Sequence, residues 1–188
     1  MYHNSLSSEY HEIAKIVHVS KLLPYAGLIL TVICIAIFLM RLYVLEPLVK
    51  RFYGDRFFRL DETQRNSFLN HWVAGGCKFV LFVISAYPAM AVVSGKASLE
   101  SPWAGSKSVK LGDTLIFTVQ LFSAMYIFEL FFRKKVSYIS AAHHIGAIVI
   151  AQSSTVLFLD PAHNGDAPLE FILCMLWGKF YFPDIHVA

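Results

Sequence analysis

Long apolar runs without formal charge constrain this chain more than any other feature. Residues 22–40 and residues 136–159 contain no Asp, Glu, Lys or Arg. At about 1.5 Å of rise per residue, a helix of that length crosses a hydrocarbon core about 30 Å thick. Three further runs are mainly apolar, so the sequence predicts about five membrane spans. The predicted spans are 22–40, 68–93, 114–132, 136–159 and 168–183.

The composition agrees with lipid as the solvent of this chain. Hydrophobic residues make up 56% of it and charged residues 15%, whereas soluble domains contain about 25% charged residues. Backbone groups in lipid must be satisfied internally, and the runs lack the alternation of membrane barrel strands. The sequence therefore predicts an all-α, polytopic transmembrane helical bundle. We expect a polar tail at 1–21, a first anchor at 22–45 and a multi-span domain at 60–188 that is incomplete at its C-terminus.

The distribution of basic residues predicts an orientation. One group follows the first predicted span and another lies in the turn after the third, so alternating spans bring both groups to the same side. Cytosolic loops are enriched in Lys and Arg, which favours a cytosolic turn and a lumenal N-terminus. We expect the endoplasmic reticulum as location. No nucleic-acid motif or basic face is present. The two groups are Lys50, Arg51, Arg56, Arg59 and Arg65, and Arg133, Lys134 and Lys135.

The candidate site lies on the hairpin predicted between the third and fourth spans. Counting outward from the short basic turn, the pair His143-His144 faces the region of Tyr126, and Glu129 is within one helical turn. A carboxylate fixes the tautomer of an imidazole and raises its basicity, which is how a histidine becomes a general base. We predict that one histidine acts and the other supports it, with Tyr126 as a phenolic donor.

Each polar residue at membrane depth also has a structural interpretation. The histidines can serve as hydrogen-bonding residues between helices, and Glu129 can pair with Arg133 one turn later. Lys78 can extend along its stem to the interface or pair with Glu129. His71 suits an interfacial position, or a haem ligand opposite one histidine of the pair. Asp113 is typical of a helix N-terminal acid. The sequence predicts no cofactor and no metal site.

Three stretches resemble a known family. Residues 126–135 read YIFELFFRKK, residues 137–146 read SYISAAHHIG, and residues 65–72 read RNSFLNHW. Together they resemble the TLC-domain family, the membrane domain shared by ceramide synthases and translocating-chain-associated membrane proteins. In ceramide synthases, paired histidines with acids on neighbouring helices transfer an acyl group from acyl-CoA to a sphingoid amine. His143 and His144 match that pair, and Glu129 matches the acidic position before it.

The resemblance implies a role in membrane-lipid homeostasis, linked to sphingolipids or ceramide. The chain departs from ceramide synthases beside the pair, where Ala141-Ala142 precede it and Ile145-Gly146-Ala147 follow in place of a nearby Thr. The first expectation is thus a TLC-type protein whose partners are membrane lipids. The first alternative is an N-acyltransferase that uses fatty acyl-CoA and a sphingoid base. The second is a non-catalytic membrane partner or chaperone.

Overall fold

The computed structural model describes residues 20–133 and 136–157, and these form helices joined by loops. No strand occurs within those two ranges, where the all-α prediction is confirmed. In chain order the elements are a 3₁₀ turn (Leu23–Tyr25), α2 (Ala26–Leu39), a π-helical segment (Met40–Leu45), α3 (Glu46–Tyr53), α4 (Asp55–Phe58), α5 (Glu62–Val93), a second 3₁₀ turn (Trp103–Gly105), α6 (Leu111–Phe132) and α7 (Tyr138–Leu157).

Three helical stretches of the described residues are long and apolar enough to cross a membrane. They are Leu23–Tyr53, Glu62–Val93 and Leu111–Phe132. The predicted count of about five spans is not confirmed. The predicted fourth span forms α7, a helix of 20 residues that is less apolar because it carries two histidines, a glutamine and several hydroxyl side chains. The predicted fifth span, 168–183, lies outside the described residues.

The first helical stretch is longer than the sequence predicts. We expected its span to end at residue 40, but the helix continues through Arg41 to Tyr53. Pro47 cannot donate a backbone hydrogen bond and normally breaks a helix. Here the helix continues past the proline because the residues just before it form a π-helical segment. At the end of that segment the N–H of Glu46 bonds to the carbonyl of Arg41, five residues earlier. The stretch ends at Gly54, whose φ of 48° suits a glycine.

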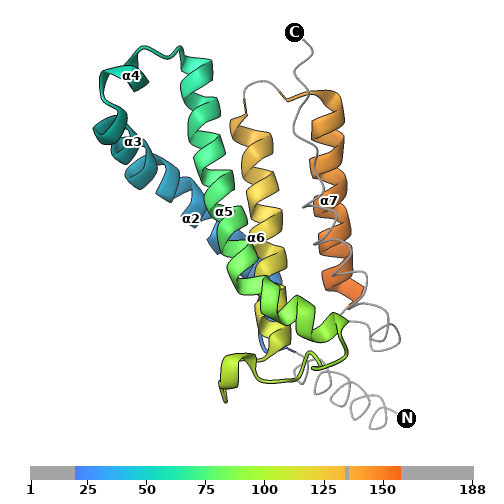
Figure 1. Cartoon of the computed structure of the whole chain (residues 1–188). Coiled ribbons are helices and arrows are strands. Elements are labelled where there is room, and N and C mark those ends of the chain that lie inside the picture. Colours follow the sequence, from blue (N-terminus) through green and yellow to red (C-terminus); the bar gives the residue numbers. More distant parts are fainter. Residues whose placement is uncertain (1–19, 134–135, 158–188) are drawn as a thin grey trace.

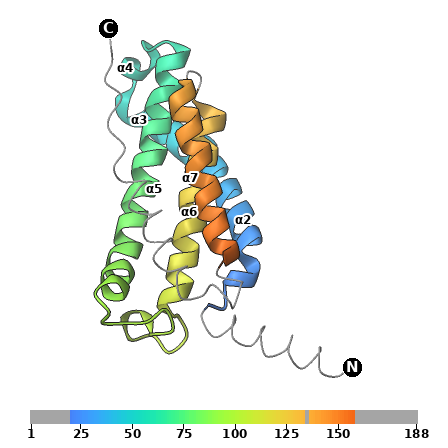
Figure 2. The ribbon, with the colours of Figure 1, turned by 90° about the vertical axis from the view of Figure 1, so that its right-hand side faces the viewer.

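The helix α6 lies at the centre of the bundle. It packs against α2, α5 and α7, and the two views show it surrounded by them (Figures 1 and 2). Leu115, Val119 and Met125 of α6 are fully buried in the main apolar core. Because α6 contacts each of the other long helices, its polar side chains have protein neighbours rather than lipid.

The surface of the bundle is more apolar than that of a soluble protein, and several polar side chains lie inside it. Large apolar side chains face outward, among them Val32, Phe79 and Ile139, while the side chains of Gln120 and Ser123 are completely buried. Exposed apolar surface on this scale is unfavourable in water. Lipid solvates such a surface, and polar side chains then join helices from within.

The helix ends that flank the two basic groups lie at one end of the bundle. The α4 helix, the start of α5, the end of α6 and the start of α7 all lie at this end (Figure 1). This is the antiparallel alternation that the predicted orientation requires. The loop between α5 and α6 lies at the opposite end, where Trp103 donates a backbone hydrogen bond to Val109 at 2.9 Å.

Candidate functional site

The antiparallel hairpin of α6 and α7 positions the candidate site. Small side chains on α7, Ala147 and Ala151, are buried against the core and allow the two helices to approach closely. The α6 helix ends at Phe132 and α7 begins at Tyr138. Side chains equally far from the end of α6 and from the start of α7 therefore lie at the same depth in the hairpin.

His144 and Glu129 form a buried pair across this hairpin. The Nε2 atom of His144 lies 3.3 Å from Oε2 of Glu129, and their side chains are 4% and 13% exposed. A carboxylate at Nε2 favours the tautomer with its proton on that nitrogen, which leaves the lone pair of the imidazole on Nδ1. This arrangement can orient His144 as a base.

Tyr126 and His143 complete the cluster. The ring of Tyr126 lies 4.6 Å from that of His144 and 6.1 Å from that of His143, between centroids. Tyr126 is buried and His143 is partly buried. The structure thus brings together all four residues predicted for the site, at the positions obtained by counting outward from the turn. His144, rather than His143, makes the close contact with the carboxylate.

Lys78 and His71 lie differently from these four. Both are exposed on α5, yet both are near enough to interact electrostatically with Glu129, as is Arg133. His71 also lines an open groove of about 890 Å³ along α5, together with Trp72 and other residues. The close contact of the Glu129 carboxylate is with Nε2 of His144, at 3.3 Å.

A second polar cluster on the same hairpin was missed by the sequence analysis. Nε2 of Gln152 donates to Oε1 of Gln120 at 3.1 Å and to Oγ of Ser123 at 2.8 Å. Nε2 of Gln120 lies 3.4 Å from Oγ1 of Thr155. The available signal was spacing: each helix carries a glutamine with a hydroxyl residue three positions later, within an apolar run. This amide cluster sets the register of α7 against α6.

The stability losses caused by removing the two amides of this cluster should not be additive. We expect Gln152→Leu to lower the free energy of unfolding by about 1 kcal/mol, since it removes two hydrogen bonds within the bundle. The double variant Gln120→Leu/Gln152→Leu should lose about 0.6 kcal/mol less than the sum of the single variants. Unfolding by SDS titration in mixed micelles measures the free energies of unfolding of the single and double variants. Ser153→Ala, at an exposed position of α7, is the control. Strict additivity would contradict direct contact between the two amides.

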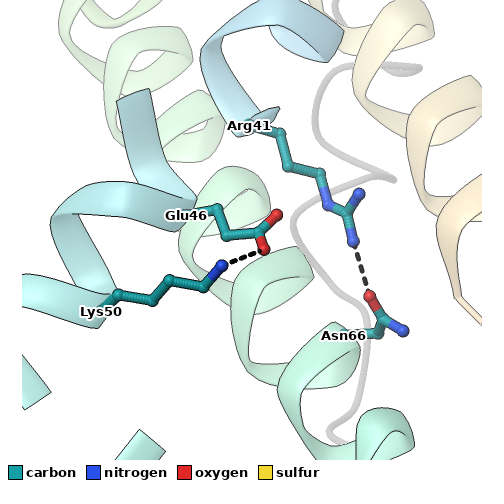
Figure 3. Close-up of polar contacts among 4 residues, drawn as sticks. All are labelled: Arg41, Glu46, Lys50 and Asn66. Carbon is teal, nitrogen blue, oxygen red and sulfur yellow. Dashed lines mark hydrogen bonds and ion pairs between the residues drawn. The ribbon is translucent and has the colours of Figure 1, made fainter. Parts of the chain in front are cut away.

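Arg41 is a buried cation in the first helical stretch. Its guanidinium donates from Nη2 to Oδ1 of Asn66 on α5 at 2.8 Å and lies 4.6 Å from the ring centroid of Phe132 on α6. Figure 3 shows this contact beside the ion pair of Lys50 and Glu46, which is 2.9 Å long. Arg41 therefore ties three helices together at the end of the bundle that holds the basic loops.

Asp113 lies at the opposite end of α6 from Glu129. Its carboxylate accepts hydrogen bonds from Oγ of Ser20 at 2.7 Å, from the N–H of Lys21 at 2.8 Å and from the N–H of Lys110 at 3.0 Å. The prediction of a helix N-terminal acid is confirmed. The same carboxylate also holds the chain that enters the first helical stretch.

Within the described residues, no three His, Cys, Asp or Glu side chains are grouped as a metal site. Comparisons of the chain with protein-family models, curated proteins and solved structures gave no match.

Proposed function

We propose that this chain is an integral membrane protein of the TLC type that acts on membrane lipids in the endoplasmic reticulum. The single observation that carries the proposal is the buried contact between His144 and Glu129 inside an apolar hairpin. Ionisable groups in such a place are unfavourable unless they have a partner, and they commonly mark a functional site. The family resemblance around the same residues supplies the link to lipids.

The reaction that the family resemblance implies for this pair is acyl transfer from a fatty acyl-CoA to the amine of a sphingoid base. The amine nitrogen attacks the thioester carbonyl carbon, so that a C–N bond forms and the C–S bond breaks. His144 accepts the proton that the amine nitrogen loses and then passes this proton to the departing thiolate, which returns the imidazole to its neutral form. An amide and free coenzyme A result. Glu129 holds the imidazole in position, and Tyr126 packs against its ring.

The proposal is tested with full-length protein purified in detergent and returned to lipid vesicles. The vesicles receive a labelled sphingoid base and palmitoyl-CoA, and the labelled amide is measured by mass spectrometry. We expect product from the wild-type protein and from Ile145→Ala, an exposed neighbour on α7. We expect none above background from His143→Ala/His144→Ala.

Two outcomes would overturn the proposed reaction. Equal product from wild type and the histidine double variant would remove both imidazoles from the chemistry. Absence of product from the wild type, together with full rescue of a lipid phenotype by the double variant in cells, would favour the non-catalytic partner. In that case the pair acts as a structural contact between helices.

A further inference from the structure

The segment from residue 46 to residue 59, here called the α3–α4 arm, concentrates positive charge at one end of the bundle. The arm contains four basic residues against two acids, Glu46 and Asp55. The arm extends sideways from the bundle, away from α6 and α7 (Figure 1). The four basic residues of the arm are Lys50, Arg51, Arg56 and Arg59, and all are exposed.

The arm is held in place by a small apolar core of its own. Val49 and Phe57 pack with Leu69 of α5, and all three are buried. Tyr53 and Phe57 also contact the ring of Phe68, at 5.3 and 6.2 Å between centroids. This core fixes the orientation of α3 and α4 relative to the spanning helix α5. The exposed side chains of the arm therefore present a fixed surface.

That surface combines free cations with exposed aromatic rings. Phe52 is 76% exposed and Phe58 is 54% exposed, and they alternate along the chain with the arginines. Lys50 is paired with Glu46. In the part of the chain that the structure describes, Arg51, Arg56 and Arg59 have no carboxylate within ion-pair distance. Exposed aromatic side chains beside uncompensated cations are typical of segments that lie in the interface of a membrane.

We propose that the α3–α4 arm binds anionic phospholipid headgroups of the leaflet into which it emerges. The phosphates and carboxylates of the headgroups neutralise the arginines, which have no carboxylate partner in the described part of the protein. Phe52 and Phe58 enter the boundary between headgroups and acyl chains. The arm begins with α3, the last part of the stretch Leu23–Tyr53 that is long and apolar enough to span a membrane, so it lies where that stretch reaches headgroup level. Groups of basic residues beside a spanning helix select anionic lipids in this way. This inference is independent of the proposed reaction.

The test uses full-length protein reconstituted into vesicles of phosphatidylcholine. Spin-labelled phosphatidylserine or spin-labelled phosphatidylcholine is added, and electron paramagnetic resonance measures the motionally restricted fraction of each at the protein surface. We expect wild-type protein to prefer phosphatidylserine, with the preference decreasing as salt is raised. The variant Arg51→Gln/Arg56→Gln should remove most of that preference, because each of the two lost cations contributes about 1 kcal/mol at an anionic surface.

The control variant Lys96→Gln/Lys107→Gln removes the same charge from exposed positions in the loop at the opposite end. We expect it to keep the preference for phosphatidylserine. Equal restriction of both lipids by the wild-type protein would overturn the inference. So would an equal loss of preference in the control variant, because net charge rather than the arm would then be responsible.

Discussion

Replacing Glu129 with glutamine is expected to lower kcat for acyl transfer by at least about 100-fold, the lower end of what a positioned proton acceptor contributes. The amide keeps the size of the side chain but loses the charge that orients His144 and stabilises its protonated form. Because Glu129 acts through His144 rather than on the substrate, KM should remain nearly unchanged. Initial rates over a range of sphingoid-base concentrations separate the two constants.

Two companion variants make this result specific. Glu129→Asp retains the charge and should recover part of the lost rate, whereas a purely structural role would make glutamine the better replacement. His143→Ala should reduce kcat less than His144→Ala, since His144 makes the 3.3 Å contact with the carboxylate. Equal effects of the two histidines, or unchanged kcat in Glu129→Gln, would contradict the assignment of the pair.

Replacing Asp113 with alanine is expected to cause the largest loss of stability, about 3 kcal/mol. The carboxylate is buried and accepts three hydrogen bonds, and hydrogen bonds to a charged group contribute about 1.5–3 kcal/mol each before the protein relaxes. Loss of these bonds also releases residues 20 and 21 from α6. The free energy of unfolding by SDS titration measures the effect.

Ser20→Ala serves as the matched variant because it removes one of the three donors and leaves the carboxylate in place. We expect it to lower the free energy of unfolding by about 1 kcal/mol. Asp113→Asn keeps one acceptor oxygen, so its loss of unfolding free energy should lie between those of Ser20→Ala and Asp113→Ala. A loss below about 0.5 kcal/mol in Asp113→Ala would show that water replaces the protein donors at this end of α6.

Much of the site could be predicted because the basic turn between α6 and α7 is short. Two helices joined so closely must run antiparallel, and counting residues from the turn then places Tyr126, Glu129 and His144 at one level. Sequence alone could not decide which histidine meets the carboxylate, because adjacent residues on a helix point about 100° apart and the rotation of α7 is set by packing. The amide cluster at Gln120 and Gln152 contributes to that packing.

The extent of the first helical stretch was harder to predict. Pro47 and the charges that follow residue 40 are ordinary signals for the end of a span. In the structure a π-helical segment accommodates the proline, and Arg41 finds partners on two other helices. Such partners come from residues distant in the chain, so local patterns do not reveal them. The contacts of α7 with α6 likewise come from residues distant in the chain.

The central position of α6 has a consequence for how the chain enters the membrane during synthesis. As an isolated helix, α6 would insert poorly into lipid, because polar groups oppose insertion and α6 carries Gln120, Ser123 and Glu129. The helices α2 and α5 both contact α6 and are synthesised before it. They can contact α6 as it leaves the translocation channel and shield much of its surface, and α7, synthesised after α6, then brings His144 to the carboxylate of Glu129.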